Sequence, residues 1–144
     1  MVRKAEKADA GCIAEMAVMM WDSNSAEELA AEFEAMLENE ECALFIYCID
    51  HKPVGFAQCG LRHDYVEGTK DSPVGYLEGI FMREEYRKKG CARELLAQCE
   101  SWAKQKGCAE FASDCELDND GSFAFHMHMG FAEANRIICF VKQI

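Results

Sequence analysis

A basic segment near residue 90 has the composition of an anion-binding site. Three cationic residues precede a glycine and two small residues, in the order Arg87-Lys88-Lys89-Gly90-Cys91-Ala92. The segment lies between a β-prone run and an amphipathic run, so it predicts the first turn of a helix. Such a turn offers free backbone N–H groups, a favourable dipole and room for close approach. We expect residues 88–93 to bind a diphosphate; an ordinary basic turn that caps a helix is the alternative.

A second group of residues combines carboxylates with aromatic rings. Glu78 and Asp114 lie on two strands that we expect to be neighbours, and loops carrying Trp21, Asn24 and Tyr65 could close over them. Carboxylates bind ammonium groups, and aromatic faces bind cations and cover sugar rings. The group therefore predicts a pocket for a polycationic small-molecule amine. Taken singly, Glu78 could be an exposed strand residue, Asp114 a turn former and Trp21 a core residue.

The elements that must position these residues follow from periodicity and capping signals. A capping box at Ser25 and Glu28 predicts a helix, and Gly79 inside a strand predicts a bulge or a close backbone approach. Asp9 is expected to cap the first helix. The expected strands are residues 2–5, 43–49, 54–61, 76–82, 109–113 and 137–142, and the expected helices are residues 9–20, 25–37, 90–107 and 118–130. This order predicts one α/β domain, residues 1–144, with a mixed sheet and helices on both faces.

Composition and net charge exclude several classes of protein. The 144 residues are 50% hydrophobic, which is enough for one core, and the net charge is −11. That charge argues against nucleic-acid binding and can steer a polycation inward. No apolar stretch is long enough to span a bilayer, so no membrane segment is expected. The N-terminus leads into Glu6 and Asp9 where a signal peptide would have an apolar region, so we expect a cytoplasmic protein. The nine cysteines lack metal or redox spacing, so we expect them to be reduced and mostly in the core; no metal is expected.

The chain resembles the GNAT superfamily of acetyltransferases. The defining segment of that family is a strand followed by Q/R-x-x-G-x-G/A at the start of a helix, and residues 76–105 match it in order and spacing. Asn119 and the pair Gly130-Phe131 match a second cofactor-contacting segment. The resemblance covers nearly the whole chain. It implies a mixed, mostly antiparallel central sheet and transfer of an acetyl group from acetyl-CoA to an amine.

The resemblance also implies which residues contact acetyl-CoA. Ile80, Phe81 and Met82 would pair with the pantetheine arm as an added strand does, and an N–H near Ile80 would polarise the thioester carbonyl. Asn119 would bond the cofactor arm, although a helix cap is an equal alternative. The pyrophosphate would be held by the N–H groups of Lys88, Lys89, Gly90, Cys91, Ala92 and Arg93.

Within the superfamily, the chain looks most like the compact aminoglycoside 6′-N-acetyltransferases, which confer antibiotic resistance. The matching pieces are Met20-Trp21, His63-Asp64-Tyr65-Val66, residues 76–80, 111–114, 118–119 and 126–131. The implied substrate contacts are Trp21, Asn24, Tyr65, Glu78, Asp114 and Asn135. Asn135 departs from the pattern, because relatives often carry an acid there.

The implied mechanism is direct attack of the 6′-amine on the thioester in a ternary complex. We expect Asp114 to position the amine and accept its proton, with Glu78 assisting. His126 stands where many family members carry a tyrosine that protonates the leaving thiolate. An imidazolium could do the same, or His126 could be a packed or capping residue.

The end of the chain predicts self-association. The superfamily usually ends with two strands, whereas only one, residues 137–142, can be placed here. A sheet that is one strand short has an exposed edge. We therefore expect a homodimer in which the C-terminal strands complete each other's sheets.

Other functions fit parts of the pattern. A polyamine or another small amine could be the acceptor in place of an aminoglycoside. The chain could also be a non-catalytic CoA-binding module, or a purely structural domain, although the latter leaves residues 87–93 without a purpose.

Overall fold

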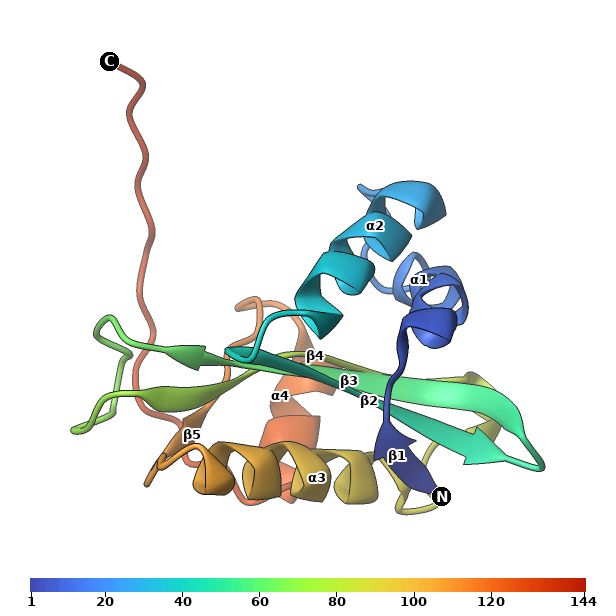
Figure 1. Cartoon of the computed structure of the whole chain (residues 1–144). Coiled ribbons are helices and arrows are strands. Elements are labelled where there is room, and N and C mark those ends of the chain that lie inside the picture. The colour runs from blue at the N-terminus through green and yellow to red at the C-terminus, as the bar shows by residue number, and fades with distance from the viewer.

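The computed structural model describes all 144 residues and shows a sheet between two pairs of helices (Figure 1). In chain order the elements are β1 (Val2–Lys4), η1 (Lys7–Asp9), α1 (Ala10–Ala17), α2 (Ala26–Leu37), β2 (Cys42–Ile49), β3 (Lys52–Arg62), β4 (Val74–Met82), η2 (Glu84–Tyr86), α3 (Cys91–Gln105), β5 (Phe111–Ala112) and α4 (Asp120–His128).

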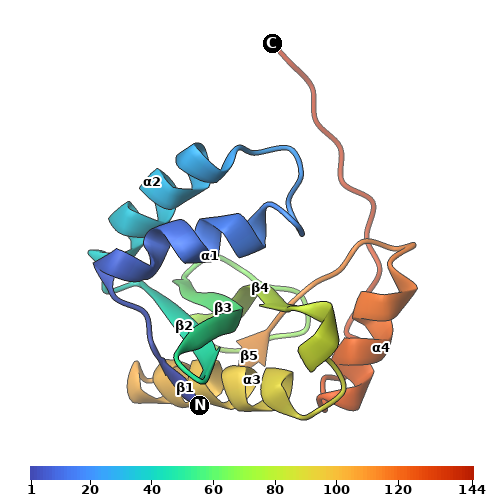
Figure 2. The ribbon, with the colours of Figure 1, turned by 90° about the vertical axis from the view of Figure 1, so that its right-hand side faces the viewer.

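The five strands form one sheet in the order β1-β2-β3-β4-β5. All neighbours are antiparallel except β4 and β5, which are parallel. Helices α1 and α2 cover one face, and α3 and α4 lie on the other (Figures 1 and 2). The predicted fold class, a mixed and mostly antiparallel sheet with helices on both faces, is therefore confirmed.

Local signals explain the helices on both sides. At the start of α2, the Glu28 N–H donates to Ser25 Oγ at 3.2 Å and the Ser25 N–H donates to Glu28 Oε2 at 3.1 Å, which is the predicted capping box. Helix α3 buries Leu95, Leu96, Cys99 and Trp102 at helical spacing. Its end at residue 105 is followed by a glycine with φ of 91°, as a helix C-terminus favours.

The sheet separates two hydrophobic cores. A cluster of 14 buried residues lies between the sheet and α3, and a cluster of 12 lies between the sheet and α1 with α2. Alternate strand residues contribute to each core, because neighbouring side chains on a strand point to opposite faces. Leu44 and Ile46 of β2 thus pack under α1 and α2, whereas Phe45 and Tyr47 pack toward α3.

Some predicted elements need correction. Asp9 does not cap α1 with its side chain: its carboxylate accepts two hydrogen bonds from Arg3, at 2.7 and 2.8 Å, and one from the Glu6 N–H at 2.8 Å. Strand β5 has only two residues, instead of the predicted run 109–113. Only Phe111 and Ala112 of that run have ladder partners, on β4.

The predicted last strand, residues 137–142, is also wrong for the single chain. No part of residues 131–144 is helix or strand. Phe131 still packs on the core and Asn135 binds Glu67, whereas the end of the segment extends away from the body (Figures 1 and 2). Its large apolar side chains are exposed: Ile137, Ile138, Phe140, Val141 and Ile144. A β-prone sequence forms a strand only where a neighbour supplies the ladder, and no strand of the same chain lies beside it.

All nine cysteines are unpaired in the structure. Cys59, Cys91 and Cys99 are buried and Cys139 is exposed, so the expectation of core positions holds for only some of them. None of the helices is both long and apolar enough to cross a membrane.

Candidate functional site

A β-bulge in β4 determines where Glu78 points. Gln58 pairs with Gly79 and Cys59 pairs with Leu77, which leaves Glu78 as an extra residue without a partner on β3. Leu77 points into the core below α3. The bulge lets both Glu78 and Gly79 face the side of α1 and α2.

Gly79 is required at this position because Trp21 lies directly on the strand. A Cβ on Gly79 would lie only 2.6 Å from Trp21 Cζ2 and 2.7 Å from Cη2. The indole also makes an edge contact with Phe56, with ring centroids 6.3 Å apart. The sequence predicted a bulge or a close backbone approach at Gly79, and the structure contains both.

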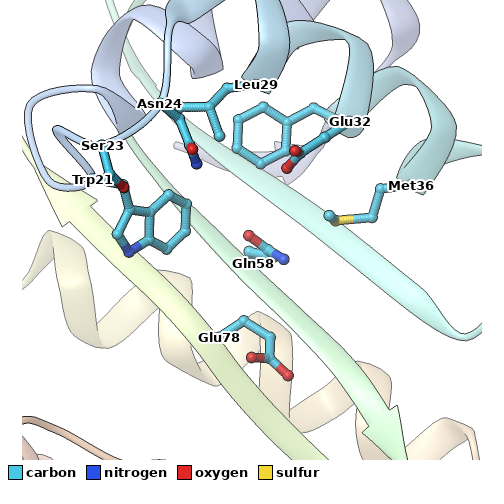
Figure 3. Close-up of a pocket in the computed structure, with 9 residues that line it drawn as sticks. Trp21, Ser23, Asn24, Leu29, Glu32, Met36, Gln58 and Glu78 are labelled. Atoms are coloured by element: carbon cyan, nitrogen blue, oxygen red, sulfur yellow. The ribbon is translucent and has the colours of Figure 1, made fainter. Parts of the chain in front are cut away.

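Trp21 and Glu78 belong to a cleft of about 310 Å³ between α2 and the sheet. We call it the acidic pocket and define it by its lining residues: Trp21, Ser23, Asn24, Leu29, Glu32, Phe33, Met36, Gln58 and Glu78. Figure 3 shows Glu32 on α2 and Glu78 on β4, with Gln58 of β3 between them. The pocket thus combines carboxylates with an aromatic wall, as a site for a polycation requires.

Asp114 lies outside this cleft but is connected to it through Tyr76 and Arg62. The Tyr76 hydroxyl donates a hydrogen bond to Asp114 Oδ2. The Arg62 guanidinium lies over the Tyr76 ring, with its central carbon 3.6 Å from the ring centroid. Arg62 also binds Glu78, with Nη2 at 3.0 Å from both carboxylate oxygens and Nε at 3.2 Å from Oε1. Burial, and then the bond to Asp114, raises the pKa of Tyr76, so the hydroxyl stays protonated and acts as a donor.

The segment around Gly90 presents a row of free backbone donors. The N–H groups of residues 88–93 donate no hydrogen bond within the chain, whereas those of Arg87 and Glu94 bond the carbonyls of Glu84 and Gly90. Gly90, with φ of 84° and ψ of −7°, is the N-cap of α3, and no side chain caps this helix. A Cβ at Gly90 would meet no atom within 4 Å, so no other part of the chain covers this residue on that side. This arrangement fits an anionic group such as a diphosphate.

Strands β4 and β5 diverge beside this turn. They pair only at Gly75 with Phe111 and at Tyr76 with Ala112. Beyond these pairs, Ile80, Phe81 and Met82 remain bound to β3 but have no partner on the β5 side. An extended ligand could add to this half of β4 as a further strand.

Asn119 and His126 hold α4 and β5 in place. The Asn119 side chain caps α4 by accepting a hydrogen bond from the Ser122 N–H at 3.0 Å. The His126 ring lies between Ser122 O, 2.7 Å from Nδ1, and Ser113 Oγ, 2.7 Å from Nε2. Both residues therefore have structural contacts, which the sequence analysis named as the alternative to a contact with the cofactor. His, Cys, Asp and Glu side chains form no group of three that could hold a metal ion.

Tyr65 and Asn135 are not part of the acidic pocket. Tyr65 is 78% exposed, on the loop between β3 and β4. The Asn135 side chain donates to Glu67 Oε2 at 3.3 Å, so the start of the C-terminal tail lies against that same loop. The loop and the tail thus form a neighbouring surface, and the structure brings only Trp21, Asn24 and Glu78 of the predicted substrate contacts into the pocket.

Comparison with known proteins identifies the family. The sequence profile of the "Acetyltransferase (GNAT) family" matches residues 13–131. The chain belongs to this family. Among curated GNAT relatives, an aminoglycoside N(6′)-acetyltransferase type 1 of Stenotrophomonas maltophilia is 38% identical over 140 residues, covering 96% of this chain and 90% of its own.

Solved structures of GNAT enzymes match the fold over the whole chain. The aminoglycoside antibiotic 6′-N-acetyltransferase AAC(6′)-IG from Acinetobacter haemolyticus matches with a TM-score of 0.95 and 35% identity, covering 100% of this chain and 99% of its own. AAC(6′)-Iy, in complex with the bisubstrate analogue CoA-S-monomethyl-acetylneamine, matches with a TM-score of 0.95 and 34% identity, covering 100% and 98%. The fold and the acetyltransferase class predicted from the sequence are confirmed.

Several residues in or beside the acidic pocket were not predicted from the sequence. Glu32 lies within the apolar stripe of α2, between Leu29, Phe33 and Met36, and a charge at such a position is a signal that could have identified it. Gln58, Arg62 and Tyr76 carry no comparable signal, because their roles depend on strand register and on a bulge.

Proposed function

We propose that this GNAT enzyme is an aminoglycoside 6′-N-acetyltransferase that uses acetyl-CoA and confers antibiotic resistance. The observation that carries the proposal is that β4 joins two sites. One side of its C-terminal half is an open strand edge beside the free N–H groups of residues 88–93, and its bulge directs Glu78 into the acidic pocket. Relatives at 38 to 40% identity bear the same name, which supports this choice of acceptor.

The cofactor side follows from the free donors. The N–H groups of Lys88, Lys89, Gly90, Cys91, Ala92 and Arg93 bind the pyrophosphate of acetyl-CoA, where the α3 dipole favours negative charge. Ile80, Phe81 and Met82 pair with the pantetheine arm, and an N–H near Ile80 polarises the thioester carbonyl. Asn119 and His126 contribute contacts from α4 in addition to their structural bonds.

The acceptor binds in the acidic pocket, on the face of the sheet that α1 and α2 cover. Trp21 covers a sugar face, and Asn24 and Glu78 bind polar and ammonium groups in the pocket. Asp114 orients the 6′-amine, while Tyr65 and Asn135 extend the contact surface over the neighbouring loop and tail. The net charge of −11 attracts the polycation toward this site.

The reaction is direct attack in a ternary complex. The 6′-ammonium loses a proton through Asp114, assisted by Glu78, and the free amine attacks the thioester carbonyl carbon. The new C–N bond forms and the C–S bond breaks. Of the two protons that leave nitrogen, one is released to water through Asp114, and the other ends on the CoA sulfur.

Acetyl transfer to kanamycin or tobramycin tests the proposal, with an analogue that lacks the 6′-amine as the negative control. We expect CoA release only with the 6′-amine present, and at least a 100-fold loss of kcat/KM in Asp114→Ala, because positioning and proton transfer are lost together. A variant that keeps most of its kcat/KM refutes the role of Asp114. Faster turnover of a polyamine than of either antibiotic refutes the acceptor assignment.

The proposal includes a cytoplasmic homodimer. The unpaired cysteines suit a reducing compartment. The exposed apolar tail has the composition of a strand without a neighbour, and a second copy could supply the sheet edge. Light scattering at micromolar concentration should give the mass of a dimer, and deletion of residues 132–144 should give a monomer. A monomeric mass for the full chain refutes the dimer without affecting the chemistry.

A further inference from the structure

Neither of the two proposed acceptor carboxylates belongs to a residue with a cross-strand ladder partner. Glu78 is the extra residue of the β4 bulge, so no cross-strand neighbour fixes its orientation. Asp114 lies two residues beyond β5, past the last ladder pair, Tyr76 with Ala112. Backbone pairing therefore does not restrain the orientation of either side chain. Catalysis requires the opposite, because misplaced groups lose most of their effect.

Each carboxylate also has a single side-chain partner. Glu78 is bound only by Arg62, through three N–H to oxygen contacts of 3.0 to 3.2 Å. The Asp114 carboxylate accepts a hydrogen bond only from the Tyr76 hydroxyl. These two partners are themselves stacked, with 3.6 Å between the guanidinium carbon and the ring centroid.

The sheet register explains why this stacking is possible. Tyr76 pairs with Gly60 across the strands, and Arg62 lies two residues further along β3 on the same face. Because Gly60 has no side chain, nothing from its position covers the Tyr76 ring, and Arg62 can lie over it. From there, the guanidinium reaches the bulged Glu78.

We propose that Arg62 and Tyr76 are positioning residues that hold Glu78 and Asp114 together as one acceptor-binding unit. The inference rests on the proposed function of this site. Arg62 binds Glu78 through a bidentate ion pair, which sets both the orientation and the distance of the carboxylate. Tyr76 occupies Oδ2 of Asp114 and leaves Oδ1, which has no partner in the chain, for the amine of the acceptor.

Tyr76 is a donor in this unit and not the base. Its raised pKa, due first to burial and then to Asp114, keeps the hydroxyl protonated at neutral pH. Because the hydroxyl hydrogen is committed to Oδ2, the carboxylate cannot rotate freely. Arg62, which stacks on the ring, restrains Tyr76 in turn.

The first test is Tyr76→Phe, which keeps the ring below Arg62 and removes only the hydroxyl. With kanamycin as acceptor, we expect kcat to fall about tenfold and the KM for acetyl-CoA to stay unchanged, since a hydrogen bond to a charged group is lost. Tyr47→Phe is the matched control. It removes a bond of the same type, from Tyr47 to Glu94 Oε1 at 3.2 Å, on the other face of the sheet, and should leave kcat unchanged.

The second test separates Arg62 from Tyr76. Arg62→Gln should raise the KM for kanamycin about fivefold. Arg62→Lys keeps the charge but not the bidentate geometry, so its KM should lie between those of Arg62→Gln and the unchanged protein. A fall in this KM would mean that Arg62 competes with the acceptor for Glu78, and would overturn a positioning role.

Double variants test whether the residues act as a unit. Tyr76→Phe should add almost nothing to the loss in Asp114→Ala, because the group that it positions is already absent. Full additivity, or a Tyr76→Phe variant with the kcat of the unchanged protein, overturns the inference. The proposed function fails separately, if the unchanged protein does not acetylate kanamycin at all.

Discussion

The contact between Trp21 and β4 can be tested by adding one methyl group, in Gly79→Ala. The new Cβ would lie 2.6 Å from Trp21 Cζ2 and 3.1 Å from Met20 Cε. Carbon atoms pack at about 3.5 to 4.0 Å, so the indole must retreat by about 1 Å. Phe56 lies against the indole, with centroids 6.3 Å apart, and limits its movement into the core.

The expected cost follows from this geometry. Overpacking costs about 1 to 3 kcal/mol, and Trp21 follows α1 in a loop that can yield, so we expect a loss of about 1 to 2 kcal/mol in unfolding free energy. The displaced indole would also cover the acceptor less well. The KM for kanamycin should therefore rise about fivefold, which is the loss of one aromatic contact.

Urea unfolding and steady-state kinetics measure the two effects, and Gly11→Ala is the matched control. A Cβ at Gly11 meets no atom within 4 Å, and this residue lies in α1. Alanine there should stabilise the protein by up to about 1 kcal/mol and leave KM unchanged. If Gly79→Ala matches the unchanged protein in both stability and KM, the indole does not lie on β4 and the reasoning is refuted.

Three further predictions concern the helix ends and one ion pair. Gly90→Ala should weaken acetyl-CoA binding several-fold in calorimetry, because its φ of 84° costs a side chain about 1 to 2 kcal/mol; unchanged affinity would contradict pyrophosphate binding by the turn at residues 88–93. Ser25→Ala should lower the unfolding free energy by about 1 kcal/mol through loss of the capping box with Glu28, and no change in urea would exclude that role. Arg3 lowers the pKa of Asp9, so this carboxylate stabilises the fold above its unfolded pKa of about 3.9 and loses that effect as pH falls through the folded value. The Tm difference between the unchanged protein and Asp9→Asn should thus be present at pH 7 and shrink below about pH 4, and a constant difference would refute it.

Most of the fold could be predicted because its signals are local. The capping box of α2, the apolar spacing of α3 and the glycine after it each depend on a few neighbouring residues. The turn at residues 88–93 was predictable for the same reason: its free N–H groups follow from a glycine at a helix start. Glu78 and Trp21 could also be predicted as site residues from their types, and the structure places both in the lining of the acidic pocket.

The errors and omissions arise where partners are distant in sequence. Asp9 has the right residue type for a cap, but Arg3 and the Glu6 N–H compete for its carboxylate. The tail has the composition of a strand, yet strand formation depends on a neighbour and not on composition alone. The connection from Arg62 through Tyr76 depends on the register of β3 and β4, which a sequence pattern does not determine.

The separation of the two cores has a consequence for specificity. The residues that would recognise the acceptor lie on the side of α1 and α2, whereas the turn at residues 88–93 begins α3 on the other side. Substitutions at sites that share no contacts usually act additively. Substitutions in the α2 wall of the pocket, for example at Glu32 or Met36, can therefore change the choice of acceptor and leave the turn at residues 88–93 intact.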